Sequence, residues 1–152
     1  MKVFVTGVAG QLGHDVVNEL TKRGHQAVGS DIAPTLESCA SYVPLDITDA
    51  AAVEQTIMQV QPDAIVHCAA WTAVDAAEDE ENQAKVRAIN VDGTKHIADA
   101  AKKADAKMVY ISTDYVFDGQ GETPWEPDCK DYKPLNVYGQ TKLDGELAVS
   151  GT

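Results

Sequence analysis

Short apolar runs recur along the chain, and longer segments with apolar residues three or four positions apart lie between them. A short apolar run is typical of a buried strand, and the wider spacing is typical of a helix with one buried face. The sequence predicts strands over Lys2–Thr6, His25–Gly29, Ser41–Leu45, Ala64–Ala69 and Lys107–Ser112. It predicts helices over Gln11–Arg23, Ala50–Val60 and Gln83–Ala104, and a further helix that opens with Tyr138.

Strands and helices alternate in this prediction. Such an order favours an α/β fold, a doubly wound parallel sheet of Rossmann type whose ligands bind at the carboxyl ends of the strands. The length of 152 residues suits one dinucleotide-binding domain over residues 1–152. The fifth strand would lie at a sheet edge with exposed apolar surface. We therefore expect a fragment of a longer protein, or a short chain that forms an oligomer such as a homodimer.

Local signals refine the helices. Gly24 suits the end of the first helix, and Thr48 or Asp49 would cap the second. Gly93 lies inside the longest helical pattern and lowers its helix propensity by about 1 kcal/mol relative to alanine, so we expect a packing reason for it. The acidic segment 78–81 is interpreted as a solvated face.

Three glycines, Gly7, Gly10 and Gly13, lie between the first strand and the first helix. A dinucleotide fold needs glycines at this junction for a tight turn, for close approach of a pyrophosphate and for packing of helix against strand. The N-terminus of the helix then directs free N–H groups at the anion. The spacing is GxxGxxG, and a tight turn that binds nothing is the alternative. We interpret it as a dinucleotide-binding turn.

Two acidic residues follow strands at the same predicted edge. Asp31 comes about twenty residues after the glycines, where a carboxylate binds the adenosine ribose and disfavours the 2′-phosphate of NADP. This position slightly favours NAD, although Asp31 could also be an ordinary loop residue. Asp46 either meets the adenine or only shapes a turn. Small residues after the fourth strand, such as Ala69 and Ala70, would let a flat cofactor approach the backbone.

Composition excludes several classes of partner. Twelve basic and twenty-four acidic residues leave a net charge of −12, which argues against binding to nucleic acid or to an anionic membrane. The three cysteines have no paired spacing, which predicts reduced thiols and a cytoplasmic location. The four histidines have no metal-ligand spacing, so no metal site is expected. The longest apolar stretch, 64–74, is too short to cross a bilayer.

Catalytic chemistry is predicted downstream. Tyr138 and Lys142 are four residues apart and share one face of the predicted helix. A phenol has a pKa of about 10, and an adjacent ammonium stabilises its phenolate. Such a tyrosine can give a proton to a carbonyl oxygen as a hydride reaches the carbon, and Thr113, at the carboxyl end of a strand, can hold that oxygen. YxxxK alone is common on surface helices, so the prediction depends on its combination with the glycine turn.

The motifs GVAGQLG and STDYVFDG, together with Tyr138 and Lys142, resemble those of extended short-chain dehydrogenases/reductases. More narrowly, HCAAWTAVDAAE, STDYVFDG and PLNVYGQTKLDGE are similar to motifs of the dTDP-4-dehydrorhamnose reductase family. The resemblance implies that NADH or NADPH reduces the 4-keto group of dTDP-6-deoxy-L-lyxo-4-hexulose to give dTDP-L-rhamnose, a precursor of cell-surface polysaccharide.

The resemblance also implies residue roles. Tyr138 would be the acid, Lys142 would tune it and hold the nicotinamide ribose, and Thr113 would orient the keto oxygen. The other implied cofactor contacts are Gly7, Gly10, Gln11 and Leu12 at the pyrophosphate, Asp31 at the adenosine ribose, Asp46 and Ile47 at the adenine, and Ala69, Ala70 and Thr72 along the middle. The residues implied to face the sugar are Val74, Asp75 and Tyr115, beside Thr113.

Alternatives stay open at this point. Sugar-nucleotide 4,6-dehydratases resemble this chain but carry Thr-Asp-Glu where this chain has Tyr115 as the third residue, so the carboxylate for elimination is missing. The family also includes a non-catalytic regulatory subunit of methionine adenosyltransferase, which binds a nicotinamide cofactor and a partner protein. Its reductases continue into a smaller domain that binds the nucleotide-sugar, and we expect this chain to stop before it. An inactive cofactor-binding fragment is the third interpretation.

Overall fold

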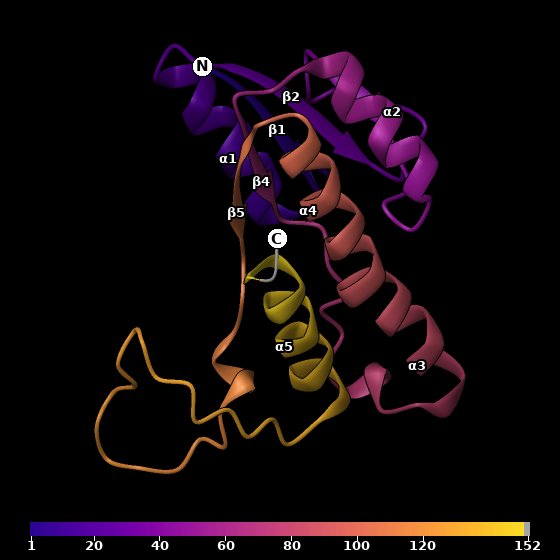
Figure 1. The fold of residues 1–152 in the computed structure, drawn as a ribbon. Coiled ribbons are helices and arrows are strands. Elements are labelled where there is room, and N and C mark those ends of the chain that lie inside the picture. The colour runs from indigo at the N-terminus through magenta and orange to yellow at the C-terminus, as the bar shows by residue number, and fades with distance from the viewer. Residues whose placement is uncertain (151–152) are drawn as a thin grey trace.

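A parallel five-stranded sheet with the order β3-β2-β1-β4-β5 runs through the computed structural model, which describes residues 1–150 (Figure 1). All four neighbouring pairs of strands are parallel, which confirms the doubly wound arrangement expected from the sequence. The strands are β1 (Lys2–Thr6), β2 (Gln26–Asp31), β3 (Tyr42–Pro44), β4 (Ala64–His67) and β5 (Lys107–Tyr110). The boundaries of β2 to β5 differ from the predicted ones by one or two residues.

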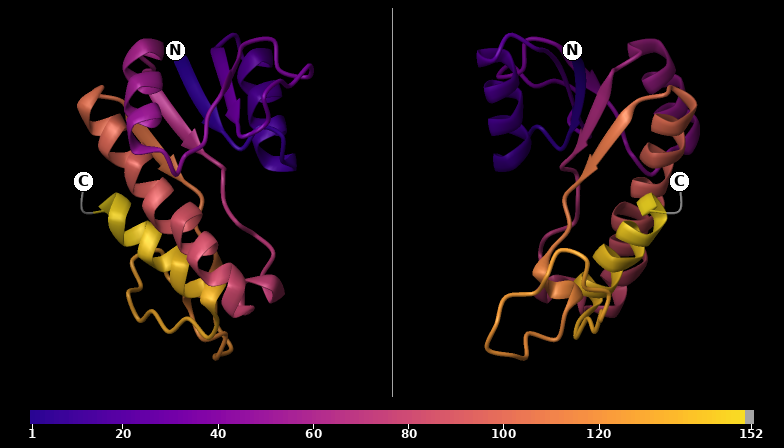
Figure 2. Two further views of the ribbon diagram at one scale, coloured as in Figure 1. Left: turned by 90° about the vertical axis from the view of Figure 1, so that its right-hand side faces the viewer. Right: turned by 60° about the vertical axis from the view of Figure 1, so that its left-hand side comes forward.

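Helices cover both faces of the sheet. Helix α1 packs on one face against β1 and β2, and α2 and α4 pack side by side on the other (Figure 2). Helix α5 runs along α4. The helices are α1 (Gln11–Lys22), α2 (Ala50–Val60), α3 (Glu80–Arg87), α4 (Thr94–Lys103) and α5 (Val137–Ser150), with 3-10 turns η1 (Asp75–Ala77) and η3 (Asp114–Val116) and a π turn η2 (Ala88–Gly93). None of the helices within residues 1–150 has the length and apolar character needed to span a membrane.

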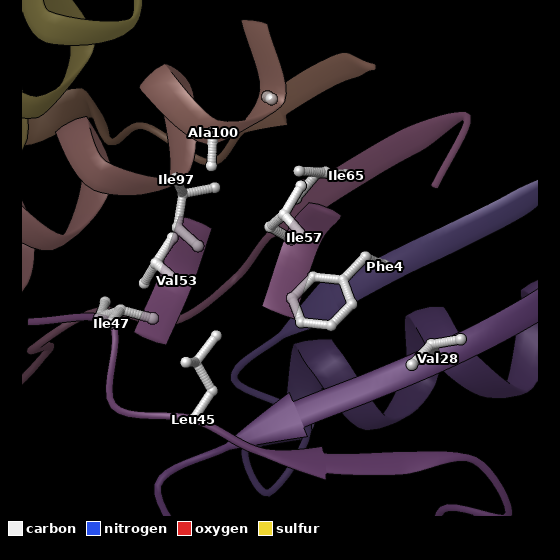
Figure 3. Close-up of a cluster of buried hydrophobic side chains, with 10 residues drawn as sticks. Phe4, Val28, Leu45, Ile47, Val53, Ile57, Ile65, Ile97 and Ala100 are labelled. Carbon is white, nitrogen blue, oxygen red and sulfur yellow. The ribbon is translucent and has the colours of Figure 1, made fainter. Parts of the chain in front are cut away.

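The larger hydrophobic core lies between the sheet and the helices α2 and α4. Phe4 and Ile65 point from the sheet toward Ile57 of α2 and Ile97 of α4, and all four are fully buried (Figure 3). A smaller cluster around Val5 lies under α1. Burial of such side chains on both faces supplies most of the driving force that fixes the strand order.

The predicted helix over 83–104 is a longer segment in three parts. It begins at Glu80, passes through the π turn η2 and continues as α4 to Lys103. Gly93 closes the π turn, and a Cβ atom there would lie 2.8 Å from both Cγ1 and Cδ1 of Ile47. The expected packing reason for Gly93 is therefore confirmed.

Strand β5 forms one edge of the sheet, as predicted. Its Val109 is 52% exposed, because no helix covers that part of the α1 face within residues 1–150. After η3 the chain makes a wide loop over 117–136, which projects from the body before α5 begins (Figure 1). Glu78, placed by the sequence on a solvated face, accepts a hydrogen bond from the backbone N–H of Val137 at 2.6 Å and so anchors the start of α5.

The contact of Gly93 with Ile47 predicts a measurable cost for Gly93→Ala. The gain in helix propensity is about 1 kcal/mol, whereas overpacking a filled site costs about 1–3 kcal/mol, so we expect a net loss of roughly 1 kcal/mol in the free energy of unfolding. Urea unfolding measures it. Ile47→Val removes Cδ1 and should recover part of that loss in the double variant. Additive effects of the two substitutions would show that this contact is not responsible.

Candidate functional site

The glycine turn between β1 and α1 is tightly packed. Gly7 has a φ of +73°, and a Cβ atom there would lie 2.7 Å from the backbone nitrogen of Ala69. A Cβ atom at Gly13 would lie 2.3 Å from the carbonyl oxygen of Gly7. Gly10 donates its N–H to that same oxygen at 3.1 Å. Side chains are thus excluded at Gly7 and Gly13, and the carboxyl ends of β1 and β4 come close together.

A cavity of about 620 Å³ opens beside this turn. Its lining includes ten residues predicted to bind the cofactor, namely Gly7, Gly10, Gln11, Leu12, Asp31, Asp46, Ile47, Ala69, Ala70 and Thr72. The volume lies in the range of pockets that enclose small molecules and cofactors. The structure also brings Ser30, Lys85, Ala88 and Ile89 to the lining, which the sequence argument missed.

Unpartnered polar groups around this cavity fit a polar, anionic ligand. The hydroxyl of Ser30 is buried and has no hydrogen-bond partner within residues 1–150. Helix α1 begins after Gly10 without a side-chain cap, so its first N–H groups are free for an anion. The residues present therefore fit a dinucleotide with its pyrophosphate at the start of α1.

The two acidic residues are held in different ways. Asp31 is the last residue of β2, and its carboxylate accepts hydrogen bonds from the backbone N–H of Ala9 at 3.0 Å and of Ile32 at 2.8 Å. It therefore bridges the glycine turn to the second strand. Asp46 accepts from the backbone N–H and the hydroxyl of Thr48 and so shapes the turn before α2, while it also lines the cavity. Asp49, rather than Thr48, caps α2 by accepting from Ala52 N–H.

Thr113 and Tyr138 come together beyond the end of β5. The hydroxyl of Thr113 lies near enough to Tyr138 to lower its pKa, and it donates a hydrogen bond to Oδ1 of Asp114 at 3.2 Å. The ring of Tyr115 meets the ring of Tyr138 edge-on, with 5.6 Å between the ring centres. Helix α5 approaches the backbone of Tyr115 so closely that only glycine fits at position 139. A Cβ atom at Gly139 would lie 2.3 Å from the carbonyl oxygen of Tyr115. Three predicted residues, two catalytic and one facing the sugar, are therefore neighbours.

Lys142 lies one helical turn after Tyr138 and is buried. Its ammonium donates to the carbonyl oxygen of Ile111 at 2.5 Å and lies 4.2 Å from the ring centre of Tyr110. Burial lowers the pKa of Lys142 to about 8, and electrostatic interaction with Cys68, which lines the cavity, partly opposes this. Lys142 is thus within electrostatic reach of Cys68 at the cavity wall, although Thr113, Tyr138 and Lys142 are not themselves among the lining residues.

The phenol of Tyr138 differs from the sequence expectation. Its pKa is raised, chiefly by burial, and the hydrogen bond from Thr113 opposes the rise. Lys142 does not lower it, because the ammonium is directed at Ile111 instead. In this structure Tyr138 is therefore protonated at neutral pH, which suits a proton donor.

Val74 and Asp75 lie at the start of η1. Within residues 1–150 no hydrogen bond or ion pair joins them to Thr113 or Tyr138, so their role at the sugar stays a prediction. The segment that follows them is nevertheless anchored to α5, because Glu78 binds Val137, the residue before Tyr138.

Asn90, in the π turn, connects the segment after β4 to helix α5. Its side chain accepts from the backbone N–H of Trp71 at 2.8 Å and donates to the carbonyl oxygen of Trp71 at 3.2 Å and to the hydroxyl of Thr141 at 3.1 Å. The sequence placed Asn90 on a buried helix face but gave no reason for an amide there. A buried amide needs several partners, and these three satisfy it.

His67 forms a second buried polar connection. Thr6 accepts from the backbone N–H of Ala69 at 3.1 Å and shares a 2.8 Å hydrogen bond with Nδ1 of His67. Nε2 of His67 lies 3.1 Å from the hydroxyl of Thr94. A neutral ring with the proton on Nε2 satisfies these contacts, since the Thr6 hydroxyl can then donate to Nδ1. The network fixes the backbone of Ala69 at the cavity wall.

The family model described as RmlD substrate binding domain matches residues 1–152. This chain belongs to that family. It is 40% identical over 146 residues to a dTDP-4-dehydrorhamnose reductase of Streptomyces griseus, covering 96% of this chain and 44% of that protein. It is 38% identical over 148 residues to methionine adenosyltransferase 2 subunit beta of Pongo abelii, covering 97% of this chain and 42% of that protein.

Solved structures agree with this membership. The dTDP-4-dehydrorhamnose reductase of Bacillus anthracis, solved in complex with NADP, superposes with a TM-score of 0.86 at 35% identity over 99% of this chain and 49% of that chain. The enzyme WbmH of Bordetella bronchiseptica, solved in complex with NAD+, superposes with a TM-score of 0.84 at 29% identity, over 99% of this chain and 51% of that chain. This RmlD-family chain thus spans about half the length of the relatives it matches, and its structural relatives bind NADP or NAD.

Burial of His67 predicts how stability depends on pH. Burial, with a smaller contribution from the charge of Lys142, lowers its pKa from 6.5 to about 3. Below pH 6.5 the unfolded chain therefore binds a proton that the folded chain does not. The contribution of His67 to the free energy of unfolding is fully present above pH 6.5 and is lost as the pH falls toward 3. The loss has a slope of up to about 1.4 kcal/mol per pH unit.

Urea unfolding of the native chain and of His67→Gln between about pH 7 and 4.5 measures this term. The variant should be less stable at neutral pH and should lose stability less steeply as the pH falls. His14→Gln, a substitution of an exposed histidine, is the matched control and should follow the native slope. Parallel curves for the native chain and His67→Gln would contradict the assignment.

Proposed function

We propose that this chain is the NAD(P)-binding and catalytic part of a dTDP-4-dehydrorhamnose reductase, with residues 1–152 forming the cofactor domain. The proximity of Thr113 to Tyr138, with Lys142 one helical turn further along α5, carries this proposal. The relatives named as dTDP-4-dehydrorhamnose reductases support the substrate class, a dTDP-sugar. The presence of an acid (Tyr138), a hydroxyl group that can position the substrate (Thr113) and a cation (Lys142) favours an enzyme over a passive binding module.

The proposed reaction is reduction of the 4-keto group of dTDP-6-deoxy-L-lyxo-4-hexulose to give dTDP-L-rhamnose. When bound, NADH or NADPH would supply the hydride for the keto carbon. Tyr138 gives its phenolic proton to the keto oxygen, and Thr113 holds that oxygen by a hydrogen bond. Hydride and proton together convert the ketone to a hydroxyl group. Tyr115 occupies the position after Asp114, where sugar-nucleotide 4,6-dehydratases carry a glutamate, which favours reduction without elimination of water.

Lys142 is proposed to act on both cofactor and acid. Its ammonium would move from the carbonyl of Ile111 to the nicotinamide ribose and to the phenolate left on Tyr138 after proton transfer. The pKa of about 8 in this structure reflects desolvation. An anionic neighbour would raise it and keep the ammonium charged at the moment when the phenolate forms.

The cofactor is proposed to be NADH or NADPH, with Asp31 at the adenosine ribose. Its two hydrogen bonds from Ala9 and Ile32 keep the carboxylate fixed at the cavity. A 2′-phosphate would face this negative charge, which favours NADH. A related structure contains NADP and another contains NAD+, so members of this fold accept either.

A second function is supported by the 38% identity to methionine adenosyltransferase 2 subunit beta. Under this alternative the chain would bind a nicotinamide cofactor and a partner synthetase without turning over a sugar. The presence of Thr113, Tyr138 and Lys142 favours the reductase. Turnover of a dTDP-sugar distinguishes the two functions directly.

The test measures the loss of nicotinamide absorbance when the chain is mixed with NADH and the 4-keto sugar nucleotide. Tyr138→Phe should lower the rate by about 100-fold or more, because it removes the proton donor, while NADH affinity changes by less than about twofold. Tyr132→Phe, on the projecting loop, is the control for the loss of a tyrosine hydroxyl.

Two results would count against the reductase. An unchanged rate in Tyr138→Phe would remove the proposed acid. Binding of NADH by the native chain without any oxidation would overturn the reductase activity of this chain and leave the non-catalytic alternative.

A further inference from the structure

The charges around the cavity are unbalanced for a dinucleotide. A pyrophosphate carries two negative charges, and the cavity adds the carboxylates of Asp31 and Asp46. The whole chain has a net charge of −12, so its general field also repels an anion. Free N–H groups at the start of α1 contribute only partial positive charge. An added cation near the pyrophosphate would offset this repulsion.

Lys85 is the one basic side chain among the described residues that line the cavity. It lies on α3, on the side of the cavity that also contains Ala88 and Ile89. Within residues 1–150 its ammonium takes part in none of the ion pairs, in contrast to Lys95 and Lys103. Lys85 is thus a charged group beside a ligand cavity without a carboxylate to neutralise it.

The ammonium of Lys85 is placed over a fixed aromatic platform. It lies 5.7 Å from the ring centre of Trp71, and the indole N–H donates to the carbonyl oxygen of Ala73 at 3.0 Å. The backbone of Trp71 is held on both sides by the amide of Asn90. A cation over such a ring is attracted to its face and loses less freedom when it binds a ligand. Trp71, which lies between the lining residues Ala70 and Thr72, therefore holds the Lys85 ammonium beside the cavity.

We propose that Lys85, which lines the same cavity as the glycine turn, binds the cofactor pyrophosphate with Trp71 as its platform. The phosphate would then lie between the N–H groups of α1 and the ammonium of Lys85. This inference rests on the proposed cofactor function and adds a residue to it. It assigns a purpose to an unpaired cation in an acidic protein and to the buried amide of Asn90.

The test is the dissociation constant of NADH for the native chain, Lys85→Gln and Lys85→Arg, measured by quenching of tryptophan fluorescence. Lys85→Gln should raise the dissociation constant of NADH by about fivefold to tenfold, because a charge-assisted contact is lost. The dissociation constant for Lys85→Arg should stay near the native value. ADP-ribose has the pyrophosphate but no nicotinamide, and Lys85→Gln should lower its affinity by the same factor as that of NADH. AMP lacks the second phosphate, and Lys85→Gln should lower its affinity by a smaller factor. The salt dependence of NADH binding should also become shallower in Lys85→Gln.

Lys102→Gln is the matched control, since it removes the same charge from the last turn of α4 away from the cavity lining. Equal NADH affinities of Lys85→Gln and the native chain would overturn this inference and leave the proposed function intact. An equal loss of NADH affinity in Lys102→Gln would also overturn it, and so would equal losses of AMP and NADH affinity in Lys85→Gln. Either result would indicate only an effect of the net charge of the chain. Failure of the native chain to bind NADH would instead contradict the proposed function itself.

Discussion

The arrangement of the site depends on the hydrogen bonds of one buried side chain, the amide of Asn90. It holds both backbone groups of Trp71, in the segment that follows β4, and the hydroxyl of Thr141, in α5. Trp71 lies between Ala70 and Thr72, which line the cavity, and Thr141 belongs to the helix that contains Tyr138 and Lys142. An amide has both donor and acceptor, so it can satisfy these different partners at once. Replacement by an apolar residue would leave them unpaired, at about 1–3 kcal/mol for each buried group.

The π turn is what gives Asn90 this position. An extra residue in the turn shifts the helix register, so the segment before it faces the cavity and the segment after it faces the sheet core. Gly93 allows Ile47 to pack against the turn, and Gly145 lets α5 approach it, because a Cβ atom there would lie 2.6 Å from the carbonyl oxygen of Asn90. Gly93 in the π turn and Gly145 in α5 thus permit the close packing that joins the cavity beside the glycine turn to helix α5.

The sequence predicted those parts of the site that local chemistry determines. Glycines at a strand-to-helix junction and residues at the carboxyl ends of parallel strands must converge once the strand order is fixed. Six residues predicted on this ground, Gly7, Gly10, Asp31, Asp46, Ala69 and Ala70, do line one cavity. Gln11, Leu12, Ile47 and Thr72, which only the family resemblance implied, line it too. Asn90, Lys85 and His67 could not be assigned in this way. Their partners are 19 or more residues away or on other elements, so their roles depend on tertiary contacts. The direction of the Tyr138 pKa was also missed, because burial and the position of the Lys142 ammonium are not local properties.

The central claim is that the cavity beside the glycine turn binds a nicotinamide dinucleotide. Calorimetric titration of the purified chain with NADH tests it most directly, with Gly13→Ala as the variant whose Cβ atom would lie 2.3 Å from the carbonyl oxygen of Gly7. We predict saturable binding of one NADH per chain and a marked loss of affinity in Gly13→Ala, provided that circular dichroism shows the variant to be folded. A folded native chain that takes up no NADH, or a folded Gly13→Ala variant that binds it as tightly as the native chain, would contradict the claim.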